Sequence, residues 1–231
     1  MIFLQQLKWQ LTLLQRNRLI GISVLITVLY GVIFYFIRDL PNVEPFLTLL
    51  IYNDPAIIGM FFIGLGVIME SNSKVLPALF VTPINYHSYL VTRIIALTLV
   101  GTGCAAGMTA ALLGLSIHWG QFLVGVGSTC ILFSLAGIFI VSFTQDFLTF
   151  MLRSIPILLL LSLPMLNYFG LTSWMILDYM PLTGSLHFVV ASYSSKVLLT
   201  PMQAIISLVV WIPLLYTITY GIFVQRVIKS D

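Results

Sequence analysis

The stretch LIGISVLITVLYGVIFYFI, residues 19–37, decides the fold class of this protein. Thirteen of its nineteen residues are Leu, Ile, Val or Phe, and none carries a charge. Near the centre of a bilayer each of these side chains favours insertion by about 0.3–0.6 kcal/mol, and no charged residue opposes them. The stretch is also close to the roughly 20 apolar residues that a helix needs to cross a membrane. It therefore predicts a membrane-spanning helix.

The rest of the chain has the same character. Its 231 residues are 60% hydrophobic and only 7% charged. A soluble domain carries about 25% charged residues, so this chain is too apolar to face water on all sides. Its apolar segments are continuous, whereas the strands of an outer-membrane barrel alternate between apolar and polar residues. Cys104 and Cys130 fall within apolar segments and are expected to be buried apolar residues.

The fold class that we predict is an all-α membrane protein in a single transmembrane domain, residues 1–231. Its six expected spans are 19–37, 46–69, 92–115, 121–143, 149–169 and 203–225. In the second span, Asp54 followed by Pro55 is typical of a helix N-cap and first helical residue. A helix that starts there and ends at Met69 is too short for a bilayer. The helix therefore either extends a turn past Met69 or begins near Pro45 and is kinked at Pro55.

The first eighteen residues differ from the spans. Leu4, Leu7, Leu11 and Leu14 recur at helical spacing, while Lys8 and other polar residues occupy the remaining faces. This pattern predicts an amphipathic helix that lies in the membrane surface.

The segment 170–200 also differs, because polar residues, prolines and a glycine interrupt its apolar run. It predicts a re-entrant external segment rather than a seventh span. Charge is scarce within the predicted bilayer region. Asp54 and Asp178 are expected near the outer face and Asp146 near the inner face. With no carboxylate expected at mid-membrane, a transporter driven by an ion gradient is disfavoured.

The basic residues predict the orientation. With the N-terminus in the cytoplasm, eight basic residues lie inside and two lie outside, which is the asymmetry that sets topology in a bacterial-type inner or plasma membrane. Both termini are then cytoplasmic. The net charge of +3 reflects this topology, so no nucleic-acid partner is expected. The inside set is Lys8, Arg16, Arg18, Lys74, Arg93, Arg153, Arg226 and Lys229, and the outside set is Arg38 and Lys196.

Motifs for chemistry are missing from the sequence. It contains no G-x-x-x-x-G-K-[ST] nucleotide loop, no H-E-x-x-H metal motif and no G-x-S-x-G nucleophile motif. Ser185 and His187 are close in sequence but have no third group to orient them. We therefore assign no catalytic, cofactor-binding or metal-binding residue to this chain, and any energy source must be another protein.

Residues 70–93 concentrate ionisable side chains in a chain that otherwise avoids them, and they connect the second and third spans on the cytoplasmic side. Within them, residues 74–81 predict a short helix that tolerates Pro77 in its first turn and stops at Thr82-Pro83. Exposed apolar residues framed by charges are what docking into a partner's groove requires. The alternative is a loop helix that folds back on the membrane surface.

The whole chain resembles the ABC-2-type transporter permeases. The resemblance rests on the amphipathic N-terminal helix, a second span that ends in Glu70, a loop that closes in Thr82-Pro83, and Tyr89-Leu90-x-x-Arg93 at the start of the third span. The antibiotic-export permeases, including those named for fluoroquinolones, are the sub-group that it suggests. The chain departs from polymer exporters in having no large external domain, which favours a small amphiphilic or drug-like substrate.

This resemblance implies the membrane subunit of an ATP-driven exporter, paired with a second permease subunit as a homodimer or heterodimer. Two separate ATPase subunits would bind ATP and magnesium. The resemblance implies a cytoplasmic coupling helix at about 71–83. The implied coupling residues are Glu70, Lys74, Leu76, Leu79, Phe80, Thr82, Pro83 and Arg93. The connecting helix would use Leu4, Leu7, Lys8, Leu11 and Leu14, and the substrate pathway Phe61, Phe62, Met69, Met151 and Leu158.

Two other functions remain open at this point. One is a membrane receptor or assembly scaffold that docks the same kind of ATPase without transporting anything. The other is an intramembrane enzyme acting on lipid or peptide, for which Ser154, Ser162 and Asn167 are the polar candidates. A serine in a membrane helix usually bonds to its own backbone, so this second alternative has little chemical support.

Overall fold

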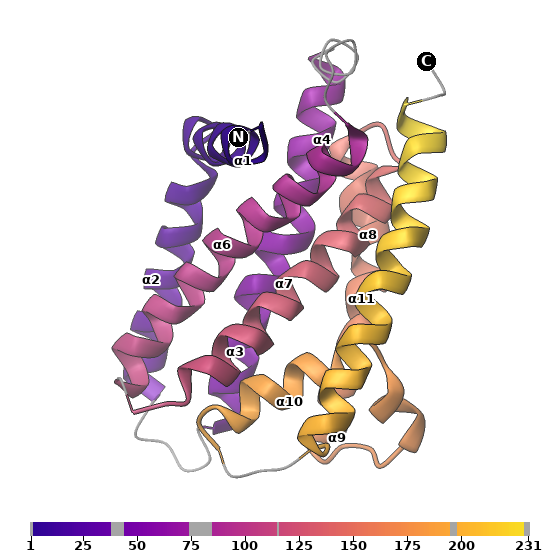
Figure 1. Cartoon of the computed structure of the whole chain (residues 1–231). Coiled ribbons are helices and arrows are strands. Elements are labelled where there is room, and N and C mark those ends of the chain that lie inside the picture. Colours follow the sequence, from indigo (N-terminus) through magenta and orange to yellow (C-terminus); the bar gives the residue numbers. More distant parts are fainter. Residues whose placement is uncertain (1, 38–43, 74–84, 115, 195–197, 229–231) are drawn as a thin grey trace.

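The protein is an all-α membrane protein, as predicted. A computed structural model describes residues 2–37, 44–73, 85–114, 116–194 and 198–228, and these residues form helices and turns without a β-strand (Figure 1). Five helical stretches among them are long and apolar enough to cross a membrane, or six if the bent pair at the N-terminus is one span. The helices that follow this pair are α3 (Glu44–Ile57), α4 (Ile63–Asn72), α6 (Tyr86–Leu113), α7 (Trp119–Val141), α8 (Phe147–Ser162), α9 (Pro164–Tyr168), α10 (Thr183–Ala191) and α11 (Pro201–Phe223).

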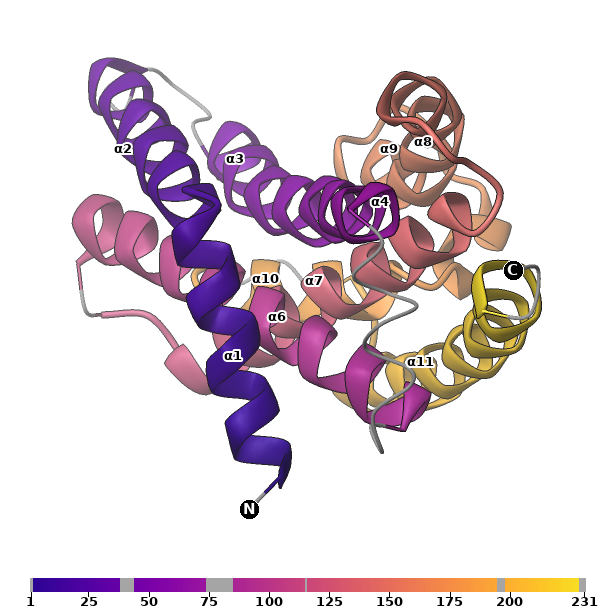
Figure 2. The ribbon, with the colours of Figure 1, turned by 90° about the horizontal axis from the view of Figure 1, so that it is seen from above.

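The N-terminal pair consists of α1 (Ile2–Arg16) and α2 (Leu19–Ile37). The two helices are bent by 66° at a short break, where Arg18 has a φ of 58°. This left-handed conformation is uncommon for a residue with a side chain and ends α1 sharply. Figure 2 shows α1 crossing over α6, and Leu14 is buried there with 7% exposure.

The second span is one helical stretch from Glu44 to Asn72, formed by α3, the π-helical turn η1 (Ile58–Phe62) and α4. The expected N-cap at Asp54 is therefore wrong, because Pro55 lies inside α3, and the alternative start near Pro45 is confirmed. A proline is tolerated within such a helix because neighbouring helices and local π-helical adjustments accommodate the lost hydrogen bond. Asp54 lies ten residues after Glu44, about 15 Å along the helix axis, and its side chain is only 1% exposed. The expectation that Asp54 lies near the outer face is therefore wrong, because it lies within the span.

Helix α7 is the centre of the bundle and contacts α3, η1, α6, α10 and α11. Glycines bring it close to the second span. A Cβ added at Gly137 of α7 would lie 2.5 Å from the Met60 carbonyl oxygen, and one added at Gly59 of η1 would lie 2.6 Å from the Cys130 carbonyl oxygen. Close backbone approach through small residues is a principal way that helices associate in membranes. These contacts make the α7 interface intolerant of larger side chains.

Between α9 and α11 the chain forms a short 3-10 helix, η2 (Met175–Tyr179), and then α10. Helix α10 is buried and packs between α7 and α11. Thr48 connects α3 to the residues on either side of this region. Its hydroxyl is 2.7 Å from the Tyr168 hydroxyl and 2.5 Å from the Tyr193 hydroxyl. At nine residues, α10 is about 13 Å long and enters the bundle without crossing it.

Helix α8 begins at an N-cap made by Asp146. Its carboxylate accepts hydrogen bonds from the Thr149 backbone N–H at 2.7 Å and from the Thr149 hydroxyl at 2.9 Å. These bonds lower the pKa of Asp146 below its ordinary value of 3.8. A depressed pKa means that the stabilisation is present above that ordinary value and is lost as the pH falls through the folded-state pKa.

We expect Asp146→Ala to lower the melting temperature by about 2 °C at pH 7, because α8 loses its cap. A smaller decrease in melting temperature is expected for Asp146→Asn, since an asparagine side chain also caps helices. Thermal unfolding of the purified protein in detergent checks this. The difference between wild type and Asp146→Ala should shrink at a pH below the Asp146 pKa, and a constant difference would contradict the assigned bonds.

Candidate functional site

One end of the bundle, which we call the α1 end, is formed by helix α1, the end of α4, the start of α6 and the end of α11 (Figures 1 and 2). Figure 2 looks onto this end. Both chain ends are there, and so are the two helices that flank residues 74–84. A site that receives a partner protein through this segment would therefore be built on α4 and α6.

Three side chains join α4 to α6 at this end. Arg93 Nη1 lies 2.6 Å from Glu70 Oε2. The Tyr89 hydroxyl donates a hydrogen bond to the same carboxylate oxygen, and Arg93 also donates to the Tyr89 hydroxyl. Tyr89, Arg93 and Glu70 are 2%, 4% and 6% exposed. We call this closed set the Glu70–Tyr89–Arg93 triad.

Local sequence explains the triad. Tyr89 and Arg93 are four residues apart on α6 and so lie on one face of that helix. On α4, Gly66 is one turn before Glu70, and a Cβ there would collide with the Arg93 guanidinium. The glycine therefore leaves the space that the guanidinium occupies. On α11, Phe223 stacks against the Tyr89 ring with the ring centroids 6.4 Å apart.

The burial of the triad determines what it does mechanically. Removing one partner of a buried ion pair usually costs about 3–5 kcal/mol, because the other charge is left uncompensated. The pair therefore keeps α4 and α6 together where they flank residues 74–84. Glu70 Oε1 is also buried, and no described residue donates a hydrogen bond to it. The triad therefore resists separation of α4 from α6 at this end of the bundle.

A second link at the α1 end joins α6 to α11. The Tyr216 hydroxyl and His87 Nδ1 share a hydrogen bond. The His87 ring also contacts the Tyr216 and Tyr220 rings edge to face, at centroid distances of 5.5 and 6.2 Å. Helix α11 is thus tied to the start of α6 by aromatic contacts, and a movement of α6 would involve α11.

A polar pocket of about 630 Å³ opens near the triad, between the end of α4, the α7–α8 turn and η3 (Val224–Ile228), the π-helical turn that follows α11. Asn72, Asp146, Gln225 and Arg226 are among its lining residues. The Arg226 guanidinium lies 4.5 Å from the centre of the Phe143 ring. The α1 end thus carries a charged and polar pocket next to the start of residues 74–84.

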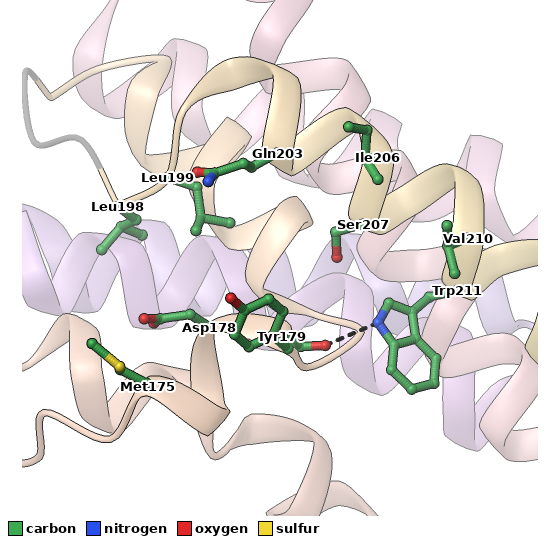
Figure 3. Close-up of a pocket in the computed structure, with 10 residues that line it drawn as sticks. All are labelled: Met175, Asp178, Tyr179, Leu198, Leu199, Gln203, Ile206, Ser207, Val210 and Trp211. Atoms are coloured by element: carbon green, nitrogen blue, oxygen red, sulfur yellow. Dashed lines mark hydrogen bonds between the residues drawn. The ribbon is translucent and has the colours of Figure 1, made fainter.

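The opposite end carries a different, mainly apolar pocket of about 540 Å³ between η2 and α11 (Figure 3). Trp211 Nε1 donates to the Tyr179 carbonyl oxygen at 3.0 Å. Asp178 accepts from Asn167 Nδ2 at 3.2 Å, and the Ser207 hydroxyl is buried with no hydrogen-bond partner in the described part of the chain. Met175 and Tyr179 are 81% and 78% exposed.

The structure brings two of the eight expected coupling residues, Glu70 and Arg93, into one contact. Both are turned inward and bond to each other. Tyr89 completes their set and was missed as a site residue, although its four-residue spacing from Arg93 was visible in the sequence. The other six lie outside the described residues: Lys74, Leu76, Leu79, Phe80, Thr82 and Pro83.

In the connecting helix α1, Leu14 is buried, Leu7 and Leu11 are half-buried against the core, and Leu4 and Lys8 are exposed. Gln10, only 2% exposed, lies on the buried face and did not figure in the sequence prediction. The amphipathic pattern therefore describes a helix that packs on the bundle with one face and leaves the other exposed.

None of the five residues expected along a substrate pathway lines either of the two pockets described above. Phe61 of η1 meets Phe150 of α8 edge to face at 6.2 Å, and Leu158 packs against the core. Met69 and Met151 are 44% and 39% exposed, while Phe62 is buried. Their roles stay predictions.

The polar candidates for an intramembrane enzyme do not converge either. The Ser154 hydroxyl donates to the Phe150 carbonyl oxygen of its own helix at 2.7 Å. Asn167 of α9 donates instead to the Trp174 carbonyl oxygen and to Asp178. These hydrogen bonds are structural and leave no nucleophile–base pair among the three candidates.

Comparison with known proteins adds an independent observation. A family model described as "Fluoroquinolones export permease protein family" matches residues 2–231. A fluoroquinolones export permease protein of Mycobacterium tuberculosis is similar, in both strain CDC 1551 / Oshkosh and strain ATCC 25618 / H37Rv. Each is 28% identical over 165 residues, which are 71% of this chain and 68% of the relative.

Proposed function

We propose that this chain, which belongs to the Fluoroquinolones export permease protein family, is the membrane subunit of an ATP-driven exporter. It is an integral membrane protein, and its relatives are named as export permeases. The observation that carries the proposal is the Glu70–Tyr89–Arg93 triad, which ties together the two helices that flank residues 74–84. Such a link is what a transporter needs if a partner protein is to move its helices through one segment.

In this proposal the α1 end faces the cytoplasm and meets two ATPase subunits, which bind ATP and magnesium. When ATP closes these subunits, residues 71–83 pass the movement to α4 and α6. The triad makes the two helices respond together, and the link between His87 and Tyr216 extends the movement to α11. Two permease subunits, identical or different, would then alternate between a cavity open to the cytoplasm and one open to the outside.

The substrate that we propose is a small amphiphilic or drug-like molecule. The relatives in Mycobacterium tuberculosis are named for fluoroquinolones, which belong to this class. The short connections at the α10 end also favour it, because the described residues there form no separate domain that would bind a polymer. A non-transporting scaffold would use the same contact with the ATPase and differs in moving no substrate.

We expect Leu79→Asp or Phe80→Asp to abolish association with the ATPase subunit while the protein still inserts into the membrane. The physical reason is that a docked apolar side chain cannot be replaced by a carboxylate without a large desolvation cost. Ser116→Asp is the matched control, because it adds the same charge at an exposed residue of the connection between α6 and α7, outside the tested segment. Co-purification of the ATPase from detergent-solubilised membranes measures the effect. Normal recovery of the ATPase with Leu79→Asp and Phe80→Asp would overturn the assigned role of residues 71–83.

A further inference from the structure

A long apolar groove runs between α2 and α6, which lie side by side in the bundle (Figure 1). Its volume is about 860 Å³. Its walls come from positions 20–36 of α2 and positions 99–111 of α6. Pockets of roughly 300–1,000 Å³ hold drug-sized ligands. The groove is therefore large enough for a molecule of the class that the exporter would carry.

Glycines keep this groove open. No heavy atom lies within 4 Å of a Cβ added at Gly31 of α2, or at Gly103 or Gly107 of α6. Gly103, Gly107 and Ala111 recur every fourth residue and so form one face of α6. These small residues leave the space empty of side chains, in contrast to Gly59 and Gly137, where the partner backbone fills it.

A buried carboxylate lies directly behind the groove wall. Thr27 and Cys104 line the groove, and the Thr27 hydroxyl donates to Asp54 Oδ2 at 3.1 Å. The same hydroxyl lies 2.9 Å from the Ser23 carbonyl oxygen of its own helix. Thr27 therefore keeps a hydrogen-bond acceptor if Asp54 takes another donor. Thr27 is thus a hydrogen-bonded link between the groove wall and the carboxylate.

Asp54 has no cation beside it in the part of the chain that the structure describes, where the ion pair is formed by Glu70 and Arg93. A carboxylate within a membrane helix is costly unless it is paired, and such residues commonly mark the path of a substrate. An acyl chain or a helix of a second subunit would fill the groove but leave the carboxylate without a counter-charge. A cationic ligand satisfies both features.

We propose that the α2–α6 groove binds a lipophilic amine, with its ammonium group at Asp54 and its apolar body along the glycine-lined face. The proposal rests on the proposed function, for which it specifies the substrate class. Several side chains on the outer flank of α2 are exposed, including Val28, Val32 and Phe36 at 60%, 52% and 78%. An amine dissolved in the bilayer can therefore enter from the side.

The test uses the full chain in nanodiscs of phosphatidylcholine, without any ATPase. The probe is dansylcadaverine, which carries a protonated amine, and the reference is its N-acetyl derivative, which is neutral. Binding is followed by the rise and blue shift of dansyl fluorescence. We expect wild type to bind the amine about tenfold or more tightly than the acetylated probe, a difference of about 1.4 kcal/mol.

Two variants distinguish the effect of the Asp54 charge from the effect of the open volume of the groove. Asp54→Asn, which keeps an acceptor for Thr27, should bring the two affinities to within about twofold of each other. Gly107→Leu should abolish binding of both probes, whereas Gly21→Leu, whose Cβ also has open space but lies outside the groove, should leave both unchanged. Thermal unfolding of each variant confirms that it is folded.

Equal binding of both probes by wild type, or an unchanged preference in Asp54→Asn, would overturn the proposal and leave an apolar groove that takes lipid chains. Because the measurement contains no ATPase, its outcome is independent of whether the chain transports. Amine-selective binding without ATP-driven export would refute the proposed function alone. Export without amine selectivity would refute this inference alone.

Discussion

Replacing Arg93 with alanine is expected to lower the free energy of unfolding by about 3–5 kcal/mol, because the Glu70 carboxylate stays buried without its cation. Glu70→Ala should have a similar effect, since it leaves the guanidinium unpaired. Both side chains are less than a tenth exposed, so solvent compensates little of this loss. Thermal unfolding in detergent, with the yield of folded protein, measures the change.

The double variant Glu70→Gln plus Arg93→Met separates stability from coupling. Replacing both members of a buried pair with neutral groups of similar size often restores stability. We expect the double variant to fold nearly as well as wild type but to show weak coupling between substrate and ATP hydrolysis, because α4 and α6 are no longer held by charge. Full coupling in a stable double variant would show that the triad is purely structural.

Gly137→Leu is expected to prevent folding altogether. A side chain at this position would have to occupy the space of the Met60 carbonyl oxygen and the Ile63 side chain, the latter 2.6 Å from an added Cβ. Overpacking a tight interface costs roughly 1–3 kcal/mol, and more where the obstacle is backbone. Because α7 contacts most of the other helices, the cost cannot be relieved by moving one neighbour.

The matched control is Gly221→Leu on α11, where an added Cβ meets no heavy atom within 4 Å. It makes the same chemical change in a membrane helix, without the close contact. The fraction of monodisperse protein after solubilisation distinguishes the two variants. If Gly137→Leu matched Gly221→Leu in yield and melting temperature, the close approach of α7 to the second span would be refuted.

Much of the helical framework can be predicted from the sequence, because each span is a continuous apolar run. Within a bilayer such a run must form its backbone hydrogen bonds internally, which a helix does. The ends of helices are less visible. Helix α11 begins at Pro201 because Thr200 and Gln203 form a capping box, and α6 begins at Tyr86 because the Asn85 side chain accepts from the His87 backbone N–H. Hydropathy places both starts later, since caps are polar.

Pairings between distant segments could not be predicted. Asp54 and Pro55 carry the local signature of a helix start, but packing on all sides keeps the helix continuous through them. Glu70 and Arg93 were expected to face a partner, and nothing in their sequence positions shows that they face each other across α4 and α6. The groove behind Thr27 likewise depends on how α2 lies against α6, which is tertiary packing.

The central claim is that this permease moves its substrate with energy from a separate ATPase. Uptake of norfloxacin into inside-out vesicles containing the chain and its co-expressed ATPase subunit tests that claim most directly. The account predicts uptake that requires ATP and the ATPase subunit, survives a protonophore and disappears with Phe80→Asp. Uptake by vesicles that contain the permease alone, abolished by the protonophore and indifferent to ATP, would contradict it.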